Sequence, residues 1–192
     1  SRVEEAIGQS VRFGRVVPEY EQRFDQYGRG RVHDLGVFGT AEDGRSIFMG
    51  VEAKVDETFG LPVRDAYLQA KANQITGKST NAPERIEQLL ALHFSEPNPS
   101  MFDVRYQLLY ATAGTIAAGA DISVLYVVVF KTPSYDETIG ASNYGDYVQF
   151  VNKARGVGCE LDDKAVTAHR LALDGNELLC LYEYFSLESS GR

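Results

Sequence analysis

The chain has 192 residues, of which 44% are hydrophobic and 24% are charged, and its net charge at pH 7 is −8. This length suits a single domain, residues 1–192, with a sizeable core. We find no apolar run approaching the roughly 20 residues of a membrane-spanning helix and no secretion signal, so we expect a cytoplasmic protein. Two cysteines, Cys159 and Cys180, are too few and too far apart for a disulfide framework or a zinc knuckle.

The first third of the sequence predicts the end of a helix, at residues 2–10, and then three strands. Pro18 places part of the first strand at a sheet edge or a bulge. Asp43 and Gly44 form a turn signal between the second strand and the third. Short connections between consecutive strands favour an antiparallel meander. The predicted strands are residues 11–20, 31–39 and 46–55.

The middle of the sequence predicts helices followed by a buried strand. Ser100 is the predicted cap of the last of these helices, and Gly119 its predicted end. The β-branched, apolar run at 122–130 has the length of a strand covered on both faces. A strand of this kind after helices indicates a layered α/β architecture with a mixed sheet, at least partly parallel. The predicted helices are residues 64–76, 82–94 and 101–118.

The last third of the sequence carries weaker signals. Residues 133–143 predict a loop, and residues 144–154 a short amphipathic helix. Residues 177–185 are apolar enough for a strand or a helix, and their period does not separate the two. The sequence contains no internal repeats and no low-complexity tracts.

The informative segment is 46–56, where apolar residues alternate with polar ones. Glu52 and Lys54 share a parity, so a strand with its period of two places their side chains on one face. On the preceding strand, Asp34 alternates with the apolar Leu35. A hairpin brings the two strands together. The pattern therefore predicts that two carboxylates and an amine converge on one patch of sheet.

Such a patch is suited to phosphodiester cleavage. Two carboxylates can hold Mg²⁺ or Mn²⁺, because hard cations prefer oxygen ligands, and the backbone carbonyl of Ala53 is well placed as a further ligand. The metal lowers the pKa of a bound water and stabilises the charge that develops on the phosphate. A lysine two residues beyond the glutamate, Lys54, can orient that water or stabilise the phosphate oxygens.

The alternative, non-catalytic interpretation of the same residues is a solvent-exposed strand face. A Glu-x-Lys triplet by itself is a weak signal, because these residues are common on exposed strands. The preceding Asp34 and the hairpin strengthen the catalytic interpretation. Gly36 and Gly50 strengthen it further, because they share the predicted face and leave room for something to approach.

The segments HDLGVFG at 33–39 and GVEAKVDETFG at 50–60 resemble the PD-(D/E)xK nuclease superfamily, in which an Asp strand and a Glu-x-Lys strand form a hairpin followed by helices and a buried strand. The second segment, with RYQLLYATAGT at 105–115, is similar to an uncharacterised bacterial and phage family assigned to that superfamily. The resemblance covers about residues 11–155. It implies a restriction-endonuclease-like three-layer core, with a mixed central sheet flanked by helices.

The resemblance also implies roles for individual residues. Asp34 and Glu52 would be the metal ligands, and Lys54 the catalytic amine. His33 stands where the motif's name has proline. Members often add an acidic residue from an early element and a polar residue from the helix after the hairpin.

Glu19 and Gln107 are the best candidates for these two additions. Each has a second interpretation, in which Glu19 solvates an edge strand and Gln107 satisfies a buried backbone group.

The acidic balance bears on the partner. Proteins that bind nucleic acid usually present a basic surface, because neutralising phosphates supplies much of the affinity. Cations concentrated near the site would reconcile this with a charge of −8. Candidates are Arg29, Arg31, Arg64, Lys71, Lys78 and Arg105.

Three functions are therefore compatible with the sequence. The first is a metal-dependent nuclease acting on nucleic acid, with DNA preferred over RNA, as a homodimer or as a component of a larger complex. The second is a catalytically silent module that keeps the fold and uses its acidic surface for binding or assembly. The third is an acidic mimic of DNA, which the ordered placement of the carboxylates disfavours.

Overall fold

A six-stranded mixed sheet forms the centre of the molecule. The computed structural model describes residues 1–96, 98–155 and 168–186. The strands lie in the order β1-β2-β3-β4-β6-β5, so chain order is kept across the first four. They are β1 Val11–Gln22, β2 Arg31–Ala41, β3 Ser46–Lys54, β4 Ile122–Lys131, β5 His169–Leu173 and β6 Asn176–Ser186.

Strands β1, β2 and β3 form the predicted antiparallel meander. A positive φ of 91° at Gly44 allows the tight β2–β3 turn, as the Asp-Gly signal predicted. Pro18 lies in β1, the edge strand, where a missing N–H costs no ladder bond. A register shift between Phe13 and Arg15 adds a bulge to the same strand.

The other half of the sheet is built by crossovers. Strand β4 runs parallel to β3, from Ile47↔Ile122 to Lys54↔Val129, and β6 runs parallel to β4. Strand β5 closes the far edge antiparallel to β6. The mixed sheet and the buried β4 are therefore confirmed.

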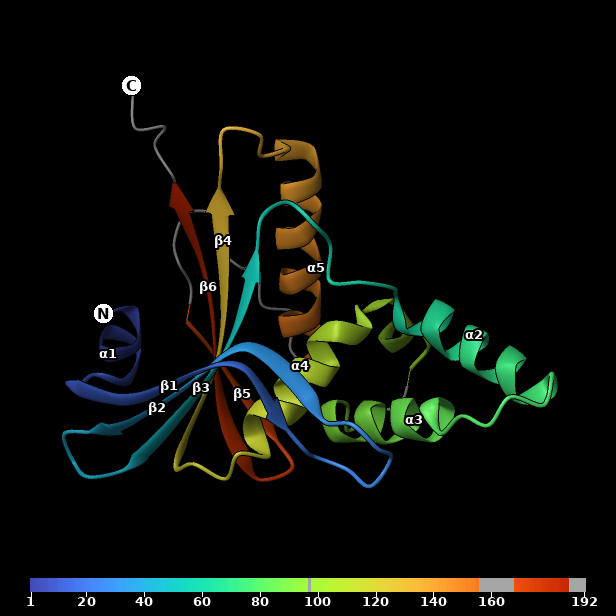
Figure 1. The fold of residues 1–192 in the computed structure, drawn as a ribbon, viewed down its shortest axis with the longest axis horizontal. Coiled ribbons are helices and arrows are strands. Elements are labelled where there is room, and N and C mark those ends of the chain that lie inside the picture. The colour runs from blue at the N-terminus through green and yellow to red at the C-terminus, as the bar shows by residue number, and fades with distance from the viewer. Residues whose placement is uncertain (97, 156–167, 187–192) are drawn as a thin grey trace.

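Helices cover both faces of the sheet, which gives three layers (Figure 1). The short helix α1 packs Val3 against one face, with apolar residues of β2, β3, β4 and β6. The other helices pack on the opposite face, around a core that includes Leu108 and Phe150. The helices are α1 Arg2–Ile7, α2 Val63–Ile75, α3 Ala82–His93, the 3-10 helix η1 Pro99–Asp103, α4 Tyr106–Ile116 and α5 Glu137–Arg155.

The single helix predicted at 101–118 is wrong. The chain forms η1, then two extended residues, and only then α4. The break arises because Arg105 pairs with Pro62 in an isolated bridge, in which the Tyr106 N–H donates to the carbonyl of Leu61 at 3.0 Å. A tertiary contact with the segment before α2 therefore overrides local helix propensity, and the predicted cap Ser100 lies inside η1.

The described part of the last third forms helix α5 and strands β5 and β6. The loop predicted at 133–143 is too long, because α5 already begins at Glu137, where the Asp136 carboxylate accepts the N–H groups of Thr138 and Ile139. The ambiguous segment 177–185 is strand β6, as its pairing with β4 shows.

Cys180 is buried as a free thiol, and burial raises its pKa. Cys159 lies outside the described residues. Of the helices that the structure describes, none is both long and apolar enough to cross a membrane.

The space predicted above Gly36 and Gly50 is filled by the protein itself. A Cβ at Gly36 would lie 2.6 Å from the Tyr20 ring, and a Cβ at Gly50 would lie 2.7 Å from both His33 and the Thr115 hydroxyl. The glycines therefore serve close packing, and the idea that they leave room for a ligand is wrong.

We expect Gly50→Ala to destabilise the fold by about 1–3 kcal/mol, because the added methyl overlaps His33 and Thr115 in a packed interior. Chemical denaturation monitored by circular dichroism measures this. Gly145→Ala is the matched control, because a Cβ there meets nothing within 4 Å on α5. That control should be neutral or stabilising by up to about 1 kcal/mol. Equal stability of Gly50→Ala and wild type would contradict the packing argument.

Candidate active site

The site centres on a buried carboxylate, that of Glu52, which is 1% exposed. Arg31 donates through Nε to Oε1 at 3.1 Å and through its terminal nitrogen to Oε2. His33 Nδ1 lies 2.9 Å from Oε1, and Gln107 Nε2 donates to Oε2 at 3.3 Å. Both carboxylate oxygens are therefore engaged twice. Four contacts match the roughly four acceptor positions of an ionised carboxylate.

These contacts set the ionisation of Glu52. Burial, the largest single influence, raises the pKa of this carboxyl. The His33 hydrogen bond and the charges of Arg31 and His33 together outweigh burial and hold the pKa below its ordinary value. Glu52 is therefore a carboxylate at neutral pH, despite its place in the interior.

Lys54 and Gln107 complete a connected network. The Lys54 ammonium donates to Gln107 Oε1 at 3.4 Å and lies 3.7 Å from the Glu57 carboxylate. Gln107 on α4 thus contacts both Glu52 and Lys54 of β3. This arrangement agrees with the predicted side-by-side placement of Glu52 and Lys54. Gln107 binds side chains here, which differs from the alternative of satisfying a buried backbone group.

Asp34 is placed differently from Glu52. Its side chain is exposed, and its carboxylate accepts the backbone N–H of Ala53 at 2.7 Å. The β2–β3 ladder ends at Leu35↔Val51, just before this contact. Asp34 therefore takes the place of a ladder partner where the strands separate, next to the backbone that joins Glu52 to Lys54.

Glu19 lies across from Asp34 in the β1–β2 ladder. The ladder passes from Pro18↔Leu35 to Tyr20↔His33 and leaves the two acids between these pairs. Glu19 is exposed and has a φ of 47°, a left-handed conformation that is uncommon outside glycine. The structure thus places both acids at one irregular step of the sheet.

The same step explains how His33 reaches Glu52. Leu35 packs toward the α1 face, whereas His33 contacts Glu52 and the Phe48 ring on the face of α4. Regular alternation would put residues 33 and 35 on one face. The alternation therefore breaks at Asp34, as at a bulge that re-aims a side chain.

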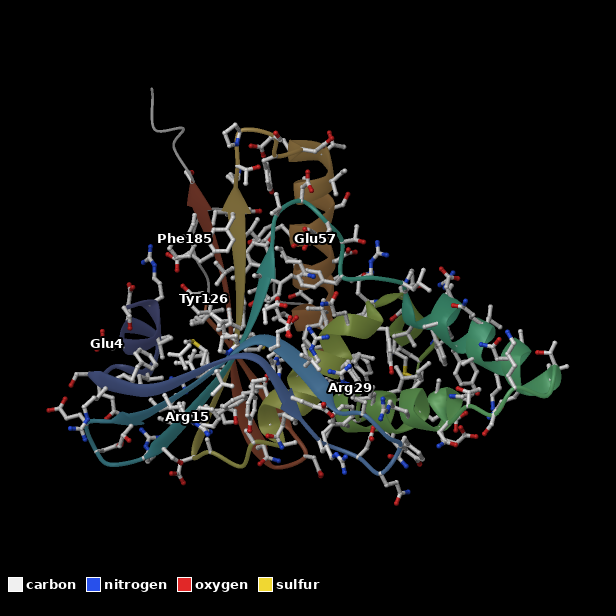
Figure 2. All side chains as sticks on the ribbon, in the orientation of Figure 1. Glu4, Arg15, Arg29, Glu57, Tyr126 and Phe185 are labelled. Carbon is white, nitrogen blue, oxygen red and sulfur yellow. The ribbon has the colours of Figure 1, made fainter. Side chains whose placement is uncertain are left out.

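Arg31 and His33 are the residues whose roles the sequence analysis missed. They lie two residues apart on β2, and both contact the Glu52 carboxylate. The same i, i+2 spacing that placed Glu52 and Lys54 on one face of a strand could have indicated that Arg31 and His33 share a face. Figure 2 labels Arg29, which lies just before β2, and Glu57, which lies just beyond β3.

The donor set can be compared with the needs of a hard cation. Asp34, Glu52 and the Ala53 carbonyl supply oxygen atoms, which Mg²⁺ and Mn²⁺ prefer. Within residues 1–96, 98–155 and 168–186, no three His, Cys, Asp or Glu side chains are arranged to share one ion. A cation here would therefore use two carboxylates, a backbone oxygen and water.

The cations proposed to face nucleic acid are largely neutralised within the chain. Five of the six form ion pairs, among them Arg105 with Asp146 at 2.9 Å and Arg29 with Glu21 at 3.2 Å. The other pairs are Arg31–Glu52, Arg64–Asp103 and Lys71–Glu87. These ion pairs leave less unpaired positive charge near the site than the sequence analysis predicted.

Comparison with known proteins identifies one family. Residues 1–182 match the family described as a domain of unknown function, DUF6946. No curated protein and no solved structure matches the chain. The matched range includes every predicted site residue, from Glu19 to Gln107.

We expect Glu52→Gln to lower the free energy of unfolding by about 3 kcal/mol at neutral pH, because it leaves Arg31 without its buried counter-ion. The difference from wild type should narrow as pH falls below the ordinary glutamate value of 4.5 and through the lowered pKa of Glu52. The sign follows because the unfolded chain binds this proton more readily.

Urea denaturation at a series of pH values measures that difference. Glu137→Gln is the control, since its exposed carboxylate should contribute little at any pH. A constant difference between wild type and Glu52→Gln from neutral to acidic pH would contradict the role assigned to the ionised Glu52.

Proposed function

We propose that this chain, which belongs to the DUF6946 family, is a metal-dependent phosphodiesterase that cleaves nucleic acid. The observation that carries the proposal is the network in which Gln107 connects the Glu52 carboxylate to the Lys54 ammonium. Two elements, β3 and α4, bring the acid, the amine and the amide together, and β2 adds Arg31 and His33 as donors to the acid. Asp34 lies one peptide away, at the Ala53 N–H.

The residues fit a divalent cation by the chemistry of their donors. Asp34, Glu52 and the carbonyl of Ala53 would hold it, with Glu19 as a further candidate ligand on the neighbouring strand. When bound, such a cation supplies an activated water and neutralises charge that develops on the phosphate.

The side chains have distinct tasks under this proposal. Lys54 is 8% exposed, so its ammonium is partly shielded from water, where it stabilises negative charge more strongly than at the surface. Gln107 is a positioning residue, because it ties the ammonium to Glu52. Asp34 holds the Ala53 peptide and so fixes the backbone between the two β3 side chains.

The substrate and setting are parts of the same proposal. We take DNA, ahead of RNA, as the substrate, acted on in the cytoplasm by a homodimer or a larger assembly. A partner subunit would help a chain with a charge of −8 to hold phosphates, because a second surface can supply the missing positive charge.

A second candidate function is a catalytically silent binding or assembly module. The observation that favours it is the saturation of Glu52 by Arg31, His33 and Gln107, together with the pairing of most cations near the site. In such a module the same network would be a structural brace between β2, β3 and α4.

The nuclease proposal predicts cleavage of plasmid DNA, single-stranded DNA or RNA by the purified protein with Mg²⁺ or Mn²⁺. Lys54→Ala and Asp34→Asn should abolish it, because each removes a charge that the reaction needs. Cleavage rates from gel assays provide the measurement. Arg45→Ala is the control, since Arg45 lies in the β2–β3 turn at the opposite end of β3, where it forms an ion pair with Asp43.

The outcome that contradicts the nuclease is residual cleavage that is the same in wild type, Lys54→Ala and Asp34→Asn. Contamination would then explain the activity. Loss of cleavage in Arg45→Ala as well would point to a general effect on folding.

A metal titration separates the two candidates without substrate. For the nuclease, Mn²⁺ should raise the melting temperature of wild type but not of Glu52→Ala, because a ligand that binds only the folded state stabilises it. A shift of a few degrees is expected at about 100-fold excess over the dissociation constant. Differential scanning fluorimetry measures it, and an unchanged wild-type melting temperature would favour the module.

A further inference from the structure

Arg31 is the only strong cation in direct contact with Glu52 among the described residues. Its guanidinium engages both carboxylate oxygens, and its side chain is 14% exposed. Unlike His33, which is fully buried, Arg31 therefore retains access to solvent. It forms the boundary between the buried carboxylate and the exterior.

The position of Arg31 is built by its surroundings. A Cβ at Gly114 on α4 would lie 2.6 Å from the Arg31 side chain, so glycine is needed to admit it. The Tyr110 ring lies 5.9 Å from the guanidinium carbon. The Tyr110 hydroxyl also lies 3.0 Å from the carbonyl oxygens of Arg29 and Gly30. These contacts hold the chain just before Arg31.

A second anchor fixes the same loop. Arg85 on α3 forms a 2.7 Å ion pair with Asp25 and donates to the Arg29 carbonyl at 3.1 Å. The backbone that carries Arg31 is thus secured at Asp25, Arg29 and Gly30. Movement of the guanidinium would therefore come from its own side-chain torsions.

A divalent cation on Glu52 would compete with this guanidinium. All four acceptor positions of the carboxylate are engaged, so a new ligand bond requires one donor to leave. His33 is enclosed between Gly50 and Gly114 and cannot withdraw easily. Arg31 also carries a full positive charge that would repel the cation at close range. Gln107 is a neutral donor and does not repel a cation, so Arg31 is the donor that a cation would displace.

The geometry points to Arg31 as an exchangeable counter-ion of Glu52 that transfers to a phosphodiester anion when a divalent cation binds. This inference rests on the proposed function, and it names a residue and a coupling that the proposed function does not contain. A guanidinium fork that fits two carboxylate oxygens also fits two phosphate oxygens. The freed side chain would lie at the exposed margin of the site, where a phosphate can reach it.

One consequence is that metal and phosphodiester bind cooperatively. The cation would displace Arg31 from Glu52, which leaves the guanidinium free to bind the phosphate. The phosphate would give the displaced Arg31 a new partner, which lowers the free-energy cost of cation binding. Such coupling is reciprocal, so the phosphodiester must strengthen cation binding by the factor by which the cation strengthens phosphodiester binding.

Calorimetric titration with Mn²⁺ tests the competition directly. Arg31→Gln should bind Mn²⁺ about tenfold more tightly than wild type, within the usual range of coupling between sites. Arg31→Lys, which keeps the charge but loses the fork, should fall between the two. Arg29→Gln is the matched control, because it removes a neighbouring cation that is 77% exposed and paired with Glu21, and its affinity should equal that of wild type.

Cooperativity is tested by repeating the Mn²⁺ titration with a saturating concentration of dimethyl phosphate, the simplest phosphodiester anion. Dimethyl phosphate should tighten Mn²⁺ binding to wild type and leave the Mn²⁺ affinity of Arg31→Gln unchanged. A gain in affinity cannot come from misfolding, so instability of the variant cannot imitate the expected result. Equal or weaker Mn²⁺ binding by Arg31→Gln, absence of binding by both proteins, or equal effects of dimethyl phosphate on both would overturn the inference.

The test also separates this inference from the nuclease proposal. Metal-dependent cleavage by wild type, with no gain in Mn²⁺ affinity in Arg31→Gln, would support the nuclease proposal and contradict the counter-ion role of Arg31. A gain in Mn²⁺ affinity without any cleavage would establish the counter-ion and remove the nuclease.

Discussion

A buried carboxylate must be compensated, and the organisation of this site follows from that constraint. An uncompensated ion in the interior is strongly unfavourable, so Glu52 requires donors on every side. They come from the neighbouring strand as Arg31 and His33, and from the covering helix as Gln107. Because these donors belong to β2 and α4, the carboxylate ties the β2–β3 hairpin to the helical layer. A change at residue 52 is therefore expected to act on fold and function together.

The irregular step at Asp34 makes this compensation possible. A regular strand would aim residue 33 at the α1 face with Leu35, and Glu52 would then lose a donor. The break in alternation turns His33 to the α4 face, while Asp34 itself binds the Ala53 N–H between the strands. Gly50 and Gly114 supply the space that the redirected imidazole needs. One local distortion thus serves several contacts that lie far apart in the sequence.

Sequence periodicity was sufficient for much of the fold. Alternation in 46–56, the Asp-Gly turn and the apolar run at 122–130 predicted the meander and the buried strand, because these signals are local. The helix at 101–118 failed because the Arg105–Pro62 bridge is a tertiary contact. The placement of Glu52 beside Lys54 followed from parity. The roles of Arg31 and His33 could not be predicted from parity, because parity assumes a regular strand and β2 is irregular at Asp34.

The charges of the molecule finally limit how a polyanion could reach this site. Most cations proposed to face nucleic acid are already paired with acids of the same chain, and the net charge is −8. Long-range attraction of phosphate by a broad basic surface is therefore weak. Recognition would have to depend on short-range contacts, from a divalent cation and from a few arginines that exchange partners. Arg31 meets that requirement, since its carboxylate partner is also the best candidate ligand for the cation.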